Sequence, residues 1–266
     1  MELLKHFEEG AKNFVILSLK DNEWDEFIAK LPVPYKNCYI PDNELQHRIK
    51  TFSSTKEKEL SEILPSIGKI LSGDFGEILS YFLFKERHKK RKVDGPKKWR
   101  WKQEKNVAAP YTDVILFSIK KGATKPSKDD LLISVESKMK ATTNNGYHPI
   151  QNAIAGAEKD YVSRIANSLS WLRKKYKDES LKVNAPVAEL NELVDSIERF
   201  IKSETVGEYS KQIKAVAFVD KTFFKDEVAK TVTIPSVIGA TFEIVVVSIK
   251  DLKKAYENVF TEIPKL

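Results

Sequence analysis

Three charged residues in the middle of the chain have the types and spacing that phosphodiester hydrolysis requires. Glu136 and Lys138 lie two positions apart in the run Leu131–Lys138, and Asp113 lies in the preceding run, Tyr111–Ile119. Because side chains alternate across a strand, Glu136 and Lys138 must point to the same face. Carboxylates at such positions can hold Mg²⁺ or Mn²⁺, and a nearby lysine can position water and neutralise developing negative charge.

Each of these residues also has a simpler interpretation. Glu136 and Lys138 can form an ion pair on a solvated strand edge, and Asp113 can cap a turn after Pro110. Asp113 shares its predicted strand face with apolar Ile115, however, and a buried carboxylate is costly unless it is paired or bound to metal. If the two strands pair as a hairpin, the three charged residues converge at one end of a sheet.

Two further polar residues lie on predicted helices. Glu77 belongs to a helix expected over Gly73–His88, which Asp74 can cap and which is apolar nearly all round. Its carboxylate therefore needs a partner, either at a metal site or in a buried salt bridge. Gln151 lies near the start of a helix expected over Pro149–Lys177, where it either contacts substrate or metal-bound water or is an ordinary polar helix residue.

A basic segment, Lys85–Lys105, contains eleven Lys or Arg and three acidic residues, which leaves the rest of the chain close to neutral. Such charge suits a polyanion such as DNA, because each neutralised phosphate releases condensed counterions, although a solvated loop can have the same composition. Trp99 and Trp101 flank Arg100 and either stack on bases or belong to the core or a partner interface. The predicted substrate-binding cations are Lys89, Lys90, Arg91, Lys92 and Arg100.

The elements that must position these residues form a mixed succession, which predicts an α/β or α+β fold with a mixed central sheet flanked by helices. We expect an N-terminal lobe over 1–65, a core with an inserted helix over 66–220, and a strand and helix completing the fold over 221–266. A polar loop with Gly122, Pro126 and Asp130 joins the two hairpin strands. Further strands are predicted at Phe14–Leu19, Trp101–Val107, Ile213–Val219 and Phe242–Ile249, and further helices after Pro186 and over Leu252–Phe260.

Composition and missing motifs exclude several classes of protein. Residues are 41% hydrophobic and 31% charged, and no apolar run approaches the ~20 residues of a membrane span. No secretory signal is evident, so we expect a cytoplasmic protein. The single cysteine, Cys38, excludes an internal disulfide and suits a small buried hydrophobe. Phosphate-binding loop, dinucleotide-binding and serine-hydrolase motifs do not occur, so an ATP-driven step would need another chain.

The order of Glu77, Asp113 and Glu136-Ser137-Lys138 resembles the PD-(D/E)xK, or restriction-endonuclease-like, superfamily over roughly residues 73–219. The sequence departs from that signature because Tyr111-Thr112, rather than a proline, directly precedes Asp113. A second resemblance covers most of the chain. Three segments, Gly73–Glu77, Tyr111–Asp113 and Val135–Met139, resemble the nuclease subunit family of the Hachiman bacterial anti-phage system.

The resemblance implies a restriction-endonuclease-like fold and a Mg²⁺-dependent DNA nuclease that works with a helicase partner in bacterial cytoplasm. It implies Asp113 and Glu136 as metal ligands, Glu77 as an accessory carboxylate ligand and Lys138 as the catalytic cation. A catalytically inactive nuclease-fold adaptor that binds nucleic acid or a helicase is the alternative. Only the enzyme would lose DNA cleavage on metal chelation. An RNase would differ in substrate rather than in site chemistry.

Overall fold

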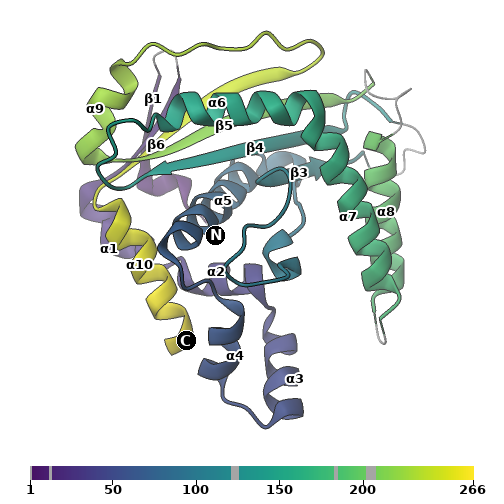
Figure 1. Ribbon diagram of the computed structural model, residues 1–266. Coiled ribbons are helices and arrows are strands. Elements are labelled where there is room, and N and C mark those ends of the chain that lie inside the picture. Colours follow the sequence, from purple (N-terminus) through teal and green to yellow (C-terminus); the bar gives the residue numbers. More distant parts are fainter. Residues whose placement is uncertain (1, 12–13, 121–125, 183–184, 202–207) are drawn as a thin grey trace.

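A six-stranded mixed sheet forms the centre of the computed structural model, which describes residues 2–11, 14–120, 126–182, 185–201 and 208–266 (Figure 1). Its strand order is β1-β2-β6-β5-β4-β3. The four inner strands run parallel, whereas β1 and β3 add antiparallel at the two edges. The strands are β1 (Phe7–Ala11), β2 (Val15–Leu19), β3 (Val114–Ser118), β4 (Leu131–Lys140), β5 (Ser210–Asp220) and β6 (Thr241–Ile249). The predicted α/β class is confirmed.

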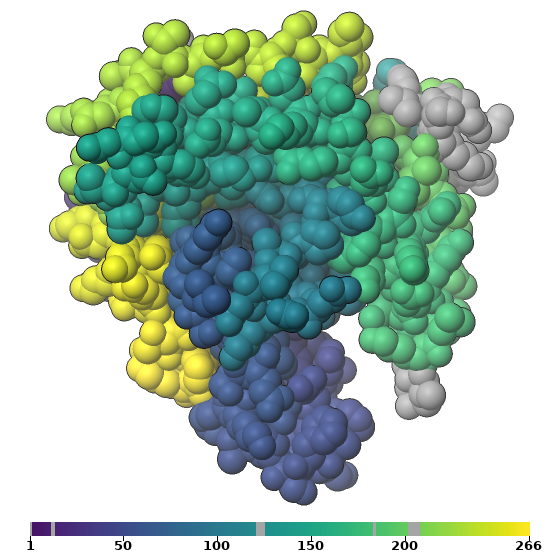
Figure 2. All heavy atoms as spheres, in the orientation of Figure 1, coloured from purple at the N-terminus to yellow at the C-terminus, as the bar shows by residue number. Residues whose placement is uncertain are grey.

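Helices cover both faces of this sheet (Figure 1). One apolar cluster lies beneath α1 (Trp24–Ala29), α2 (Pro32–Tyr39), α5 (Gly68–Arg87) and α10 (Leu252–Glu262). The other lies beneath α6 (Pro149–Lys159), α7 (Ile165–Ser180) and α8 (Val187–Ile201). The remaining α-helices of the described chain are α3 (Asp42–Phe52), α4 (Lys56–Ile63) and α9 (Lys221–Ala229). Figure 2 shows α7 and α8 as a green arm, with an open notch between the arm and the body of the molecule.

The alternation of side chains along β4 assigns its residues to these two faces. Ile133 and Val135 belong to the cluster beneath α5, and Leu132 belongs to the cluster beneath α6. Both faces are apolar because β4 has neighbours on both edges and helices on both sides. At its C-terminal end, the same alternation directs Glu136 toward α6 and Ser137 toward α5.

The predicted elements are largely confirmed, with shifted ends. The hairpin of residues 111–119 and 131–138 corresponds to β3 and β4. The strands predicted at Phe14–Leu19, Ile213–Val219 and Phe242–Ile249 are β2, β5 and β6. The helices expected after Pro186 and over Leu252–Phe260 are α8 and α10. Gly122 of the connecting loop lies outside the described residues. Cys38 is fully buried, as predicted.

Three local predictions are wrong. Residues 101–107 form no strand, because the chain turns in a 3-10 helix at Lys98–Trp101 and inserts the Trp99 side chain beneath α5. The helix expected from Gly73 begins at Gly68, so Asp74 lies inside α5 and caps nothing. The single helix expected over Pro149–Lys177 is interrupted by a π-helical turn at Asp160–Arg164.

The two terminal segments contribute strands to the central sheet. Residues 1–65 supply β1 and β2, and residues 221–266 supply β6, which lies between β2 and β5. None of the described helices has the length and apolar character needed to cross a membrane.

Candidate active site

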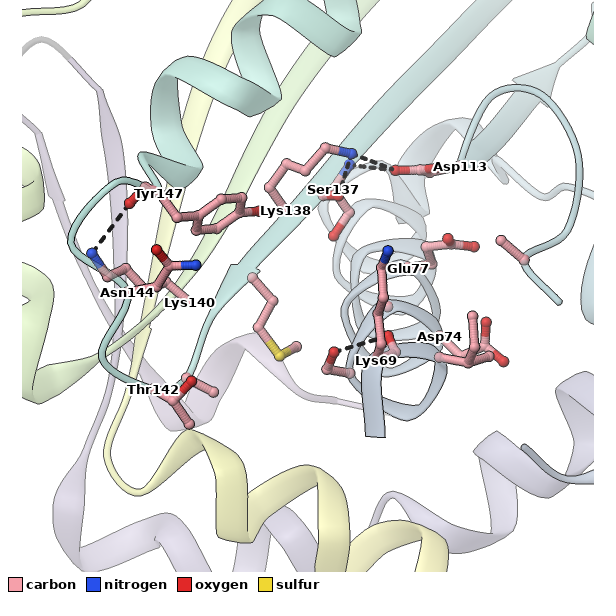
Figure 3. A pocket seen from close by; sticks show the side chains of 16 residues that line it. Lys69, Asp74, Glu77, Asp113, Ser137, Lys138, Lys140, Thr142, Asn144 and Tyr147 are labelled. Atoms are coloured by element: carbon pink, nitrogen blue, oxygen red, sulfur yellow. Dashed lines mark hydrogen bonds and ion pairs between the residues drawn. The ribbon is translucent and has the colours of Figure 1, made fainter. Parts of the chain in front are cut away.

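The antiparallel pairing of β3 with β4 brings Asp113 and Glu136 together. The registered pairs begin one residue after Asp113 and one residue before Glu136, so these two carboxylates face each other across the strands. Lys138 Nζ donates to Glu136 Oε1 and lies 3.9 Å from Asp113 Oδ2. The backbone N–H of Ser137 donates to the same Asp113 oxygen over 2.8 Å (Figure 3). The three residues predicted as the catalytic centre therefore form one cluster.

A cavity of about 480 Å³ opens beside Asp113 and Lys138. Glu77 and Asp74 reach it from α5, and Tyr147 bounds it on the side of α6 (Figure 3). The buried Glu136 carboxylate is joined to this cavity through its hydrogen bond with Lys138. The cavity has both acidic and basic walls, which suits a polar, charged ligand. Its other charged or polar lining side chains are Lys69, Ser72, Ser137, Lys140, Thr142 and Asn144.

Glu77 has both buried polar partners and a place at the cavity. Its Oε2 accepts a hydrogen bond of 3.1 Å from Trp99 Nε1 and lies 3.4 Å from Lys98 Nζ. The pKa of Glu77 is raised to about 8, chiefly by burial; the charges of Asp113 and Asp74 also raise it, and Lys98 and Lys102 lower it. The buried Glu77 carboxyl therefore lies within ion-pair distance of Lys98, and it also lines the cavity beside Asp113.

Burial and neighbouring charges determine the protonation of the central pair. Burial, followed by the charge of Asp113, raises the pKa of Glu136, whereas Lys138 and Arg164 lower it. Burial by itself lowers the pKa of Lys138, but the charges of Asp113 and Glu136 outweigh this effect, so the net shift is upward. Lys138 is therefore a cation at neutral pH, held between two carboxylates.

Asp160 and Arg164 are site residues that sequence reasoning missed. Both belong to the π-helical turn, and Arg164 Nη2 donates to Glu136 Oε2 over 3.0 Å. Asp160 is fully buried, and its Oδ1 lies 2.8 Å from Arg164 Nε. The pKa of Asp160 is raised to about 8, first by burial and then by the charge of Glu136, while Arg164 opposes the increase. The available signal was an acidic residue three positions after Ala157, on the apolar stripe of the predicted helix.

Thr112, which directly precedes Asp113, is fixed through all of its polar groups. Its N–H donates to Ser168 Oγ over 3.1 Å, and its Oγ1 donates to Asp160 Oδ1 over 3.1 Å. Its carbonyl oxygen accepts a 2.9 Å hydrogen bond from Lys98 Nζ. These bonds hold the backbone at Asp113 in place without the fixed φ that a proline would provide.

Gly156 on α6 allows the Glu136 side chain to lie close to the helix. A Cβ at this position would lie 2.6 Å from Glu136 Cγ and closer still to its carboxylate. We therefore expect Gly156→Ala to displace Glu136 and to slow cleavage by about 100-fold, since a displacement of about 1 Å can have that effect. Gly68→Ala is the matched control, because its added Cβ meets nothing within 4 Å and Gly68 does not line the cavity. Equal cleavage rates for the two variants would contradict the placement of Glu136.

The basic segment divides into two parts that lie at different places. Lys98 and Lys102 point inward, where Lys102 pairs with the buried Asp74 carboxylate. The predicted substrate-binding residues 89–92 are exposed beyond the C-terminal end of α5. Because an α-helix rises about 1.5 Å per residue, residues 89–92 lie on the order of 20 Å from Asp74 along the axis of α5. Arg100 is also exposed, and its Nη2 donates to the Asn37 carbonyl oxygen over 2.7 Å.

We expect neutralisation of the four exposed cations at 89–92 to weaken DNA binding and to flatten its salt dependence. Each lost phosphate contact should reduce the log–log salt slope by about 0.7 to 0.9. Binding titrations at several salt concentrations would measure the slope, and metal affinity should stay unchanged. A control variant neutralises four exposed lysines elsewhere, at Lys50, Lys58, Lys253 and Lys254. Identical slopes for both variants would show that the 89–92 cations bind no phosphate.

Gln151 and Trp99 are placed away from the reacting groups. Gln151 Oε1 accepts a 2.9 Å hydrogen bond from the Thr233 N–H. It lines a separate cavity of about 350 Å³ with His148 and Glu227. The structure therefore does not bring Gln151 to the cluster at Asp113. Trp99 is buried and bonded to Glu77, which makes it a core residue.

The donor chemistry of the cluster fits a divalent cation with few protein ligands. Among the described residues, no three His, Cys, Asp or Glu side chains lie close enough together to form a metal site. Asp113 and Glu136 nevertheless offer two carboxylates from facing positions, and Lys138 supplies the positive charge between them. Mg²⁺ accepts one or two carboxylates and keeps several waters, so this pair fits Mg²⁺ or Mn²⁺.

The family model of HamA matches residues 3–263 and so extends from the segment before β1 to the end of α10. No curated protein matches the chain.

Proposed function

This chain belongs to the HamA family, a component of the Hachiman anti-phage defence system, and we propose that it is a metal-dependent DNA nuclease of the PD-(D/E)xK type. One observation carries the proposal. Asp113 and Glu136 face each other across paired strands, with the Lys138 ammonium between them, beside a polar cavity of about 480 Å³. Two carboxylates and a cation are the side chains that phosphodiester hydrolysis requires.

In this proposal, Asp113 and Glu136 hold Mg²⁺ through their carboxylate oxygens. The ion would stabilise negative charge on the phosphate and lower the pKa of a water molecule. Lys138 lines the cavity and donates hydrogen bonds to a phosphate oxygen or to the attacking water. Glu77, which lines the cavity, contacts Trp99 and Lys98 behind it, and Lys98 in turn holds the Thr112 carbonyl next to Asp113.

A catalytically inactive adaptor is the second candidate. The observation that favours it is the absence of a three-ligand metal cluster among the described residues, together with the pairing of Glu77 with Lys98. Asp113→Asn distinguishes the candidates, because asparagine keeps the size of the side chain and removes its charge. A nuclease should lose cleavage in this variant and keep DNA binding. If the native chain binds DNA but cleaves none with any divalent metal, the adaptor is supported instead.

We also propose that the chain acts with a separate helicase that controls its access to DNA. The sequence has no phosphate-binding loop for nucleotide hydrolysis, and the HamA family belongs to a defence system with partners. The chain co-expressed with its genomic neighbours should co-elute with a helicase in size-exclusion chromatography. If no helicase co-elutes and the chain alone protects cells against phage, the partner is excluded and the nuclease assignment remains.

A further inference from the structure

Four aromatic side chains form a continuous cluster next to Asp113, and we propose that they bind the bases of an unpaired nucleic-acid strand. The cluster, here called the aromatic platform, consists of Tyr111, Trp171, Trp101 and Tyr176. The inference rests on the proposed nuclease function and specifies the form of its substrate.

The rings of the platform contact one another mainly by their edges. Trp101 meets Trp171 with centroids 5.6 Å apart and ring planes at 78°, and meets Tyr176 at 5.4 Å and 83°. Tyr111 lies 6.1 Å from Trp171 at a tilt of 58°. Such edge-to-face contacts hold the rings in place and cover a face of only one ring in each pair, whereas parallel stacking covers a face of both. Trp101 and Trp171 are half-buried, and Tyr111 is 43% exposed, so ring surface is accessible to a ligand.

The platform reaches the proposed reacting groups. Tyr111 is two residues from Asp113, so their Cα atoms are at most about 7 Å apart. Trp171 from α7 and Asp113 also line one small cleft together. A strand whose bases lie on these rings would therefore have its backbone close to Asp113.

Cations accompany the rings in the arrangement that unpaired strands require. Lys175 Nζ lies 5.8 Å from the Trp171 ring centroid. Lys97 and Arg100 line a cavity of about 250 Å³ with Trp101. The acidic residue of this cavity, Asp94, is paired with Lys85. Proteins bind single strands by stacking bases on aromatic rings while cations hold the phosphates, because every base has a π-face that a duplex conceals.

The backbone at Tyr111 supports a binding role over a packing role. Its φ is +64°, in the left-handed region that bulky L-residues rarely adopt. Its ring is 43% exposed. Strained conformations of this kind occur preferentially at ligand-binding sites. Trp99, which is buried and bonded to Glu77, shows the contrasting structural use of an aromatic in the same segment.

The test compares binding of a labelled oligothymidylate with binding of a blunt duplex of equal length, in chelator, by the full chain. We expect Trp171→Ala and Tyr111→Ala each to weaken oligothymidylate binding about 10-fold, the loss of one base stack, with little change on the duplex. Trp171→Phe should retain most of the affinity. Trp24→Ala is the matched control, since Trp24 is also half-buried and has a lysine, Lys254, 5.4 Å from its ring centroid.

Unchanged oligothymidylate affinity in both platform variants would overturn the inference, and so would an equal loss on the duplex. If Trp171→Ala does not fold, the Tyr111→Ala variant still decides the test, because Tyr111 is exposed. The outcome is separable from the proposed function because binding is measured without metal. Metal-dependent cleavage with no effect of the platform variants on binding would overturn only this inference. Platform-dependent binding without any cleavage would overturn only the nuclease.

Discussion

Replacing Lys138 or Glu136 with alanine is expected to reduce DNA cleavage by about 1,000-fold or more. Removing one preorganised group that stabilises transition-state charge typically costs 100-fold to 1,000-fold, and each of these residues also orients the other. Because Glu136 is buried and pairs with Arg164, Glu136→Gln should accompany Glu136→Ala as the variant that preserves shape. Circular dichroism should show a native fold, and nuclease assays should show the loss.

Lys120→Ala is the control for these variants. Lys120 also forms an ion pair, with Asp129, but the pair is exposed and distant from the cluster. Exposed pairs contribute little to stability, so this variant should cleave like the native chain. Cleavage at the native rate by both Lys138→Ala and Glu136→Ala, with contaminating nuclease excluded, would defeat the active-site assignment.

The second large effect concerns the identity of the metal. We expect Mg²⁺ and Mn²⁺ to support cleavage, and Ca²⁺ to bind but support cleavage poorly. Oxygen ligands accept all three ions, but Ca²⁺ is larger and less demanding in its geometry, so it orients the reacting groups less well. Single-turnover cleavage rates at constant ionic strength would measure the difference, with displacement of Mn²⁺ by Ca²⁺ as evidence of binding. Equal rates with Ca²⁺ and Mg²⁺ would count against the proposed role of the ion.

The hairpin that carries the site could be predicted from sequence because its signals are local. The alternation in Leu131–Lys138 places Glu136 and Lys138 on one face, and the structure confirms this with their hydrogen bond. The apolar run after Asp113 indicated a neighbouring strand, which is β3. Alternation does not determine the register between strands, however. That register, which sets Asp113 opposite Glu136, comes from the structure.

The surroundings of the site could not be predicted because they join residues that are distant along the chain. Arg164 reaches Glu136 from a π-helical turn, and helical periodicity alone predicts no interruption there. In the sequence, Trp99 belongs to a run in which aromatic and basic residues alternate, but in the structure its indole is buried against Glu77. The strand predicted over 101–107 failed for the same reason, since tertiary packing of Trp99 overrides the local propensity.

Gln151 illustrates the limit of reasoning from position in an element. Its place near the start of a predicted helix left open either a contact with substrate or metal-bound water, or an ordinary polar helix position. The helix forms as α6, but Gln151 points to the Thr233 backbone and a second cavity. Gly156, on the same helix, is the residue that lies against Glu136. Which residue of a helix meets a strand depends on the packing of the two elements, and a single sequence does not specify this.

The most direct test of the proposed nuclease is cleavage by the chain purified from its native host with its bound partners. Single-stranded DNA, duplex DNA and RNA would be incubated with Mg²⁺, with excess chelator, and with Mg²⁺ restored after chelation. We expect DNA cleavage that disappears with chelator and returns with Mg²⁺, and that is absent from Asp113→Asn prepared in the same way. DNA cleavage undiminished by chelator, or no cleavage of any DNA in Mg²⁺, would contradict the proposal.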